Sequence, residues 1–316
     1  MSGEADFLRR LRAMVSHPAA RGLMDDAALL TTSGETLVLT TDTLVEGVHY
    51  RADDPPETVG WKLAAVNLSD LAGKGAAPRA CMLNYALAGD ADWDAAFLEG
   101  LASALDAHGM PLIGGDTVAL PEGAPRVLSL TAIGAVSTER AVPDRAGARP
   151  GDILYVSGPV GDAGAGLDLL AQGEPEPDSL IAAYRTPQPH LALGQALAPL
   201  AHAMMDVSDG LLIDVRRMGE ASGCAIIIDT VPLSSDFAAL HGLSVESRLA
   251  AATAGDDYVL LAALPADVTP PDGLVAVGRC TEGEGLSVVL DGKPVTLPDR
   301  LGYEHGGDSA PFRDRP

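Results

Sequence analysis

Aspartates placed in apolar segments are the residues of this sequence best suited to carry chemistry. Each lies inside or beside an apolar run, where the pattern predicts a tight turn rather than an exposed helix face. Two carboxylates about 5 Å apart repel each other by about 3 kcal/mol at an effective dielectric constant of about 20, so several of them gather only around cations. The aspartates are Asp25 and Asp26 in MDDAALL, Asp42 in LTTDTLVEG, Asp70 in AVNLSDLAGKG, Asp116 in LIGGDTV, and Asp206 and Asp209 in MMDVSDGLL.

The donor type favours Mg²⁺ as that cation. Hydroxyl groups precede three of these carboxylates, at Thr40, Thr41, Ser69 and Ser208. Hard oxygen donors without cysteine or clustered histidine are typical of magnesium sites. Helix capping is the alternative, because Asp-Gly and Ser-Asp are common helix starts. Capping explains any one site equally well, but it explains poorly why five such sites lie in apolar segments.

Groups that would hold a phosphate are less distinct. There is no GxxxxGK[ST] motif, so the sequence has no P-loop lysine. The glycine-rich segment GPVGDAGAG, residues 158–166, precedes a helix whose first N–H groups suit an anion, although most such turns are structural. Arg145 is either a phosphate clamp or a solvated linker arginine. His49, which follows Asp42 by seven residues, is either a ligand contact or a packing histidine.

The elements that must position these residues alternate between strands and helices, which predicts a mixed α/β fold in both halves. A linker rich in Pro, Gly and Arg at 142–152 divides residues 1–140 from residues 150–316. The helix at 57–72 is expected to bury one apolar stripe and to end at Gly73 and Gly75. We expect helices at 6–15, 57–72, 92–108 and 191–201, a helix after each of the turns GPVGDAGAG and MMDVSDGLL, and strands at 35–47, 79–89, 111–118 (buried), 126–136, 153–158 and 224–229.

Composition excludes several classes of partner. The 316 residues carry a formal net charge of −23, and lysine occurs only at positions 62, 74 and 293. Such a chain repels nucleic acid and anionic membrane surfaces. The sequence has no apolar run long enough to span a membrane and no signal-peptide pattern at its start. Three widely separated cysteines predict reduced thiols in a cytoplasmic protein.

Taken together, the motifs resemble those of the thiamine-monophosphate kinases, a family related to aminoimidazole ribonucleotide synthetase, selenophosphate synthetase and a hydrogenase-maturation protein. The matching stretches run in the family's order from Asp25 to His305. They are DDAALL, TTDTLVEGVHY, GWKLAAVNLSDLAGKGAAPRA, LIGGDTV, RAGARPGD, VSGPVGDAGAGL, MDVSDGLLIDV, AGDDYVLL and GYEH.

The resemblance assigns roles to matching residues. Gly115, Asp116, Arg145 and Ser208 are expected to contact ATP, and His49 to contact thiamine monophosphate. The Mg²⁺ ligands are expected to be Asp25, Thr40, Thr41, Asp42, Asp70, Asp116, Asp206 and Asp209. Of these, Asp42, Asp70 and Asp116 are expected to act in catalysis through the metal, without a covalent nucleophile.

This sequence departs from the family pattern mainly on the substrate side. The family has Gly before its first Asp, where this chain has Met24. The family also has GGEDY, whose Glu contacts the substrate; here Asp256 keeps the charge but reaches one methylene less. Gly306 replaces the aromatic residue that packs on the substrate ring, and Phe312 is a candidate to replace it.

The resemblance also implies an architecture and a reaction. The N-terminal sheet, within residues 1–140, is expected to bind ATP and Mg²⁺ and to close a barrel with its two-fold mate in a homodimer. Residues 150–316 are expected to form a C-terminal α/β domain that completes the active site. The implied reaction is direct in-line transfer of the ATP γ-phosphoryl group to thiamine monophosphate. Two alternatives remain: another ATP-dependent synthetase of the same superfamily, and a non-catalytic ATP-binding partner protein.

Overall fold

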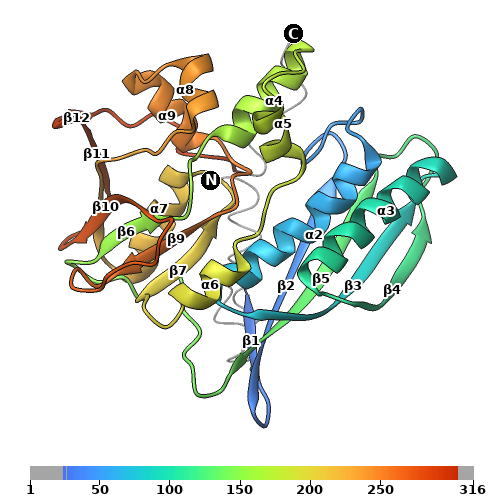
Figure 1. Ribbon diagram of the computed structural model, residues 1–316, viewed down its shortest axis with the longest axis horizontal. Coiled ribbons are helices and arrows are strands. Elements are labelled where there is room, and N and C mark those ends of the chain that lie inside the picture. The colour runs from blue at the N-terminus through green and yellow to red at the C-terminus, as the bar shows by residue number, and fades with distance from the viewer. Residues whose placement is uncertain (1–23, 26, 305–316) are drawn as a thin grey trace.

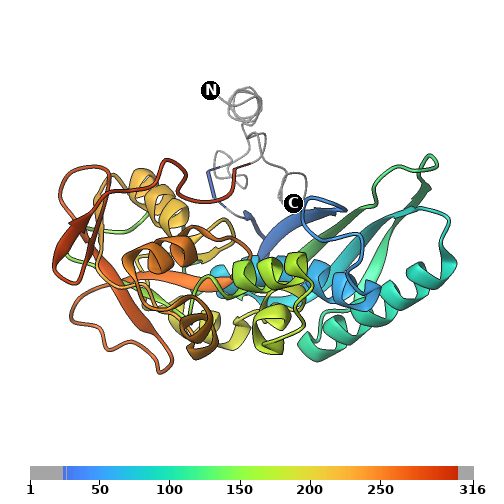
Figure 2. The same cartoon turned by 90° about the horizontal axis from the view of Figure 1, so that it is seen from above.

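A computed structural model describes residues 24, 25 and 27–304, and shows two mixed β-sheets with eight helices in that part of the chain (Figures 1 and 2). The helix expected at 6–15 lies outside the described residues. Residues 138–152 connect the two sheets without a helix or strand. The mixed α/β class that the sequence predicts is confirmed. None of the helices in the described ranges combines the length and the apolar character needed to cross a membrane.

The first sheet has the order β1-β2-β5-β3-β4, and only β3 and β4 run parallel. Two long helices, α2 (Pro56–Gly73) and α3 (Ala91–His108), lie on one face of it (Figure 1). Phe97 and Leu101 of α3 pack into a core with Leu63 and Leu68 of α2 and Leu130 of the sheet. The strands are β1 (Ala28–Thr31), β2 (Glu35–Val45), β3 (Ala77–Leu87), β4 (Leu112–Ala119) and β5 (Val127–Ser137).

Helix α2 is buried nearly all round, and not along the single stripe that the sequence predicts. One side packs on β2 and β5, and the other faces α6 (Leu191–Leu197), β7 (Ala203–Val207) and β9 (Val259–Leu264) of the second half. A helix that is apolar all round belongs between two layers. Its contact with α3 is close because both helices have glycine there. A Cβ at Gly60 would lie 2.1 Å from the Phe97 carbonyl oxygen, and one at Gly100 would lie 1.8 Å from the Glu57 carbonyl oxygen.

Strand β4 is exposed along its whole length, so the prediction of a buried strand at 111–118 is wrong for the single chain. It forms the outer edge of the first sheet, and Ile113 and Val118 have exposed fractions of 63% and 53%. The apolar composition that suggested burial instead marks a surface that this chain does not cover by itself.

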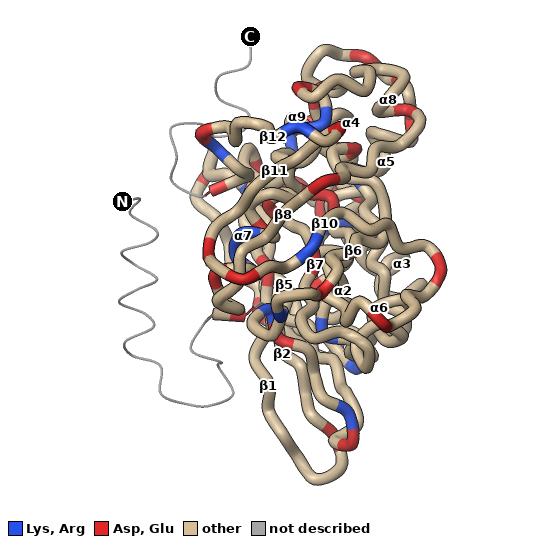
Figure 3. The backbone as a smooth tube through the Cα atoms, turned by 90° about the vertical axis from the view of Figure 1, so that its left-hand side faces the viewer, with Lys and Arg blue, Asp and Glu red and all other residues tan. Residues whose placement is uncertain are grey.

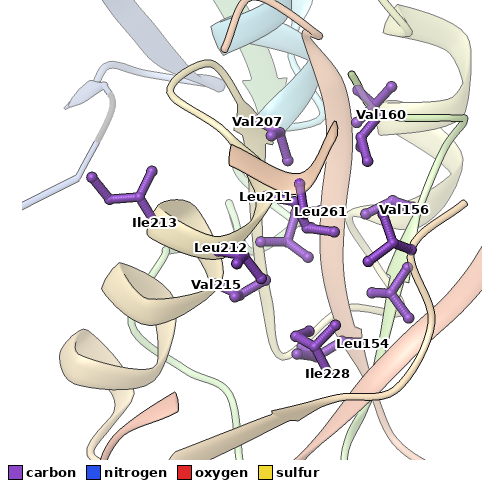
Figure 4. Close-up of a cluster of buried hydrophobic side chains, with 14 of the residues drawn as sticks. Leu154, Val156, Val160, Val207, Leu211, Leu212, Ile213, Val215, Ile228 and Leu261 are labelled. Carbon is purple, nitrogen blue, oxygen red and sulfur yellow. The ribbon is translucent and has the colours of Figure 1, made fainter. Parts of the chain in front are cut away.

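The second sheet has the order β12-β11-β8-β10-β6-β9-β7. Its residues and those of the second-half helices form a separate core. In that core, Leu154 and Val156 of β6, Val207 of β7 and Leu261 of β9 meet Leu211 at the start of α7 (Figure 4). The remaining elements are β6 (Ile153–Val156), β8 (Ala225–Ile228), β10 (Val275–Thr281), β11 (Leu286–Leu290), β12 (Lys293–Val295), α4 (Asp162–Gln172), α5 (Asp178–Arg185), α7 (Leu211–Ser222), α8 (Ser235–His241) and α9 (Val245–Thr253).

Most predicted elements are present within a few residues of their expected bounds, but strand β7 was missed. The sequence pattern of MMDVSDGLL predicts a turn and a helix, whereas its first residues form a fully buried strand. The turn assignment is also wrong for three aspartates. Asp42 lies within β2, Asp70 within α2 and Asp116 within β4.

Candidate active site

One cavity of about 1450 Å³ gathers most of the predicted site residues. It lies where β2 and α2 of the first half meet the loops after β7 and before β9 of the second half. The predicted residues that line it are Thr41, Asp42, His49, Asp70, Asp206, Ser208, Asp209 and Asp256. Segments distant in sequence therefore converge on one space, which is the usual setting of a ligand site.

Two hydrogen bonds between β2 and α2 fix the positions of Asp42 and Asp70. Asn67 is fully buried, and its Oδ1 accepts the backbone N–H of Asp42 at 3.1 Å. The Thr40 hydroxyl donates to Asp70 Oδ2 across the interface between the strand and the helix. Helix α2 therefore sets the positions of Asp42 and Asp70 on the same side of the sheet.

The second half contributes Asp206, at the end of the buried strand β7. Its carboxylate accepts a hydrogen bond from Ser69 Oγ at 2.6 Å, and both residues are buried. The close approach depends on Gly73, where a Cβ would lie 3.1 Å from the Asp206 nitrogen. Burial, together with the neighbouring Asp256, Asp42 and Asp206, raises the pKa of Tyr258 well above its usual value. Tyr258 is therefore a neutral hydrogen-bond donor among carboxylates.

An arginine holds the next aspartate along the chain. Arg217 Nη1 donates to both Asp209 and Asp214, the latter at 2.9 Å. Asp214 in turn accepts the backbone N–H of Asp209 at 3.1 Å. Complete burial raises the pKa of Asp214 to about 7 despite the nearby guanidinium. Arg217 and Asp214, both on helix α7, thus fix the position of Asp209.

The two substrate-side residues predicted from the resemblance share one neighbour. His49 Nδ1 accepts the backbone N–H of Val45 at 3.0 Å, so the neutral ring carries its proton on Nε2. Asp256 accepts the Lys62 ammonium at 2.8 Å and the Tyr258 hydroxyl at 3.0 Å. Lys62 Nζ also donates to the His49 carbonyl oxygen at 3.1 Å.

The cavity wall is strongly acidic. Acidic residues also outnumber basic ones along the chain (Figure 3). Among the described residues, the only Lys or Arg that lines the cavity is Arg300. The carboxylates of the lining are Asp42, Asp70, Asp168, Asp206, Asp209, Glu246 and Asp256. A di- or triphosphate entering this space needs added positive charge.

The donor set fits Mg²⁺ held together with a phosphate ligand. No three His, Cys, Asp or Glu side chains in the described ranges converge closely enough to enclose a metal by themselves. Mg²⁺ is commonly held by one or two carboxylates plus phosphate oxygens and water rather than by a cage of protein ligands. Asp42, Asp70, Asp206 and Asp209 supply oxygen donors from separate segments around one cavity, which suits that mode.

The glycine-rich turn before α4 also reaches the cavity through Gly161, Ala163 and Gly164. Gly161 has φ +89°, and its N–H donates to both oxygens of Asp257 at 2.9 Å. Burial raises the pKa of Asp257 well above its usual value. The Gly161 N–H group at the start of α4 is thus already hydrogen-bonded to the Asp257 carboxyl group.

Of the predicted residues outside the cavity lining, Asp25 and Arg145 lie close to each other. The Asp25 carboxylate accepts the ammonium of the fully buried Lys74 at 2.7 Å, and its Oδ1 also accepts the Arg145 backbone N–H at 3.4 Å. Asp25 is therefore part of an ion pair beside β7, where Lys74 also donates to the Met204 carbonyl oxygen at 3.3 Å.

Gly115 and Asp116 lie at the far edge of the first sheet. Strand β4 is three positions from β2, or about 14 Å at the usual strand spacing of about 4.8 Å. The register links Asp42 through Leu130 and Leu83 to Gly115. Because adjacent residues of a strand point to opposite faces, Asp116 faces away from the side on which Asp42 lies. Within one chain, Asp116 does not join the other aspartates.

The predictions for Gly306 and Phe312 lie outside the described residues. Several residues that shape the site were not predicted to take part in it, namely Lys62, Asn67 and Tyr258. A signal was present for the first two, since a charged or amide side chain inside an apolar helical segment needs a partner when buried. Nothing in the sequence indicated which partner each one has.

Comparisons with known proteins identify the family to which the chain is similar. The chain matches the models of AIR synthase related protein, N-terminal domain, over residues 24–136, and C-terminal domain, over residues 149–291. It is 37% identical over 325 aligned positions to the thiamine-monophosphate kinase of Caulobacter vibrioides, covering 96% of this chain and 91% of that protein.

Two solved structures extend the similarity to the fold. The structure of AaThiL complexed with AMPPCP and TMP has a TM-score of 0.85 and 30% identity, covering 96% of this chain and 97% of that one. The thiamine-monophosphate kinase of Stenotrophomonas maltophilia K279a has a TM-score of 0.74 and 36% identity, covering 92% and 96%. In both cases the similarity extends over both sheets.

Proposed function

The chain belongs to the thiamine-monophosphate kinase family of AIR synthase related proteins, and we propose that it transfers the γ-phosphoryl group of ATP to thiamine monophosphate. The products are thiamine diphosphate and ADP. The observation that carries the proposal is the convergence of Asp42, Asp70, Asp206 and Asp209 on one cavity large enough for two ligands. We place the reaction in the cytoplasm, in keeping with three free, buried cysteines.

Phosphate binding in this cavity requires Mg²⁺. Asp42, Asp70, Asp206 and Asp209 would hold the metal, with Thr41 beside them in the cavity wall. When bound, Mg²⁺ neutralises phosphate charge and keeps donor and acceptor oxygens in line. Thr40, Ser69 and Asn67 serve this group indirectly, because each fixes a carboxylate or its backbone.

The acceptor needs little chemical activation. A phosphate-monoester oxygen is already a nucleophile at neutral pH, so no covalent intermediate and no dedicated base is required. The contribution of the chain is to hold two anions close together and in line. His49 and Asp256, on the same cavity wall, are assigned to thiamine monophosphate, and Ser208 to ATP.

The working unit is proposed to be a C2 dimer formed through the first sheet. Residues 40–45 of β2 lie beyond the stretch that pairs with β1, so in the described chain they pair only with β5. The other edge strand of this sheet, among the described residues, is β4, which is exposed throughout. Pairing each β4 with the partner's β2 would cover both edges and close a barrel.

Such a dimer gives Asp116 and Gly115 a place in the reaction. In one chain Asp116 is three strands from Asp42 and faces the opposite side of the sheet. In the dimer, the β4 of one subunit would lie beside the β2 of the other. In the closed barrel, Asp116 would face the same side as Thr41 of the partner's β2, and it would contribute to the metal site of the second subunit from that side.

A coupled assay of ADP release tests the function. We expect release that depends on both thiamine monophosphate and Mg²⁺, and none when an aminoimidazole precursor replaces the acceptor. ADP release with the precursor alone would support a synthetase. ATP binding without turnover under either condition would support a non-catalytic ATP-binding protein.

A further inference from the structure

Lys62 is buried in helix α2, directly behind the wall of the cavity. Its side chain is 2% exposed, and it is not among the residues that line the cavity, whereas its neighbours His49, Tyr184 and Asp256 are. We propose that Lys62 is a positioning residue that holds the two substrate-side groups, His49 and Asp256, at a fixed separation. This inference rests on the proposed function, because it concerns the binding of thiamine monophosphate.

Three interactions on three segments fix the ammonium group. Nζ donates to Asp256 Oδ2 at 2.8 Å and to the His49 carbonyl oxygen at 3.1 Å, and it lies 4.1 Å from the centroid of the Tyr184 ring. Burying an ammonium is costly unless it is paired and hydrogen-bonded. The arrangement is therefore stable only when all three segments are in place around Lys62.

The tyrosine is itself held in position. Tyr184 donates its hydroxyl to Asp54 Oδ2 at 3.1 Å, and Arg185 Nε donates to Asp54 Oδ1 at 2.8 Å. Asp54 is buried in the loop that leads into α2. Helix α5 of the second half is thus joined to the first half on the same side of the cavity as Lys62.

The backbone at Asp256 also needs external support. Asp256 and Tyr258 have φ of +68° and +52°, in the left-handed region that residues other than glycine seldom adopt. Such conformations persist when several contacts hold them. Asp256 N–H donates to the Ser208 carbonyl oxygen at 2.8 Å, and the Tyr258 hydroxyl donates to Asp256 Oδ1 at 3.0 Å. Lys62 adds a contact to the Asp256 side chain from the other half of the molecule.

The contact with Lys62 is important because the side chain of Asp256 is short. Aspartate has one methylene fewer than glutamate, so its carboxylate cannot extend to follow a displaced ligand. Its position is set by the loop and by the Lys62 ammonium. Loss of the ammonium would leave Asp256, which is 30% exposed, free to turn toward solvent and away from the substrate.

The test compares Lys62→Met with wild type in steady-state kinetics. Methionine keeps the length and the apolar stem but removes the charge. We expect the KM for thiamine monophosphate to rise about tenfold or more, as for loss of a charge-assisted hydrogen bond. The KM for ATP should stay within about twofold. Lys293→Met, at the exposed lysine of β12, is the matched control and should leave both KM values unchanged.

Further variants separate positioning from general stability. Because Lys62 acts through Asp256, the effect of Lys62→Met on the KM for thiamine monophosphate should be much smaller in an Asp256→Asn background. Lys62→Arg keeps the charge and should fall between wild type and Lys62→Met. A fully additive double variant, or equal rises in both KM values, would overturn the proposal.

The outcome remains decisive if Lys62→Met does not fold. Lys62→Gln, which keeps a hydrogen-bond donor but removes the charge, then carries the test, and a folded Lys62→Gln protein with wild-type KM for thiamine monophosphate would overturn the proposal. The two inferences fail separately. Wild-type protein without acceptor-dependent ADP release contradicts the proposed function, whereas an active wild type with an unaltered Lys62→Met variant contradicts only the role of Lys62.

Discussion

At the scale of single residues, the acidic cavity wall makes the charge of each carboxylate the property to test. Asp42 is the most direct case, because Asn67 holds its backbone and its side chain lines the cavity. We expect Asp42→Asn to lower kcat for ADP release by about a hundredfold or more, since it removes the charge of a proposed metal ligand. Added Mg²⁺ should restore little of the rate.

The control for this prediction is Asp272→Asn, which makes the same chemical change at an exposed loop position. It should leave kcat and the Mg²⁺ dependence unchanged. Circular dichroism and thermal unfolding should show that both variants are folded. A near-normal kcat for Asp42→Asn would remove this residue from the proposed metal group.

At the scale of elements, the contact between α2 and α3 determines where the site helix lies. Gly100→Ala would place a Cβ 1.8 Å from the Glu57 carbonyl oxygen, so the helices would have to separate. We expect the free energy of unfolding to fall by about 1–3 kcal/mol, measured by denaturant titration. Ser103→Ala, on the exposed side of α3, should cause no such loss. Equal stability of the two variants would show that the helix pair tolerates a wider spacing.

The turn before α4 provides a pH-dependent test at the same scale. Burial raises the pKa of Asp257 in the folded protein, whereas the unfolded chain has the ordinary value of about 4. The unfolded state therefore loses this proton first as the pH rises. The stability that the protonated group contributes is present below about pH 4 and is lost as the pH rises toward the folded pKa.

Asp257→Asn cannot ionise and should avoid that loss. Its melting temperature relative to wild type should therefore increase from pH 5 to pH 8, on top of a constant offset from the altered hydrogen bond to Gly161. Thermal unfolding across this pH range measures the difference. A difference that does not change with pH would show that Asp257 ionises in the folded protein much as it does in the unfolded chain.

At the scale of the whole molecule, the two edge strands proposed to pair in the dimer and the position of Asp116 make one combined prediction. Sedimentation should show a dimer, and Ile113→Asp, on exposed β4, should shift it toward monomer by placing a charge in the proposed interface. Asp42→Asn and Asp116→Asn homodimers should each have little activity.

Mixing these two inactive variants tests whether Asp116 acts across the dimer. A heterodimer would contain one site with both changes and one site with neither. Activity should therefore recover to about half per heterodimer, in proportion to the heterodimers formed. Absence of recovery in a mixture shown to exchange subunits would mean that Asp42 and Asp116 act within the same chain.

The sequence by itself determined the element types and the chemical character of the site. Periodicity and glycine positions predicted α2, α3, β2, β3 and β5 because these are local properties of the chain. The motifs also identified eight residues that line one cavity. The oxygen-only donor set and the excess of acidic residues were likewise readable without coordinates.

Only the tertiary structure decided which of these residues meet. It brought Asp42, Asp70 and Asp206 to one cavity and joined Asp25 to Lys74, while Asp116 faces the other side of the sheet. Strand register and helix packing set those distances, and both depend on contacts between segments far apart in sequence. The sequence pattern showed that β4 is apolar, but not that the chain leaves it exposed. It showed a lysine in α2, but not that the ammonium joins two loops behind the site, because that pairing exists only after both halves have packed around the same helix.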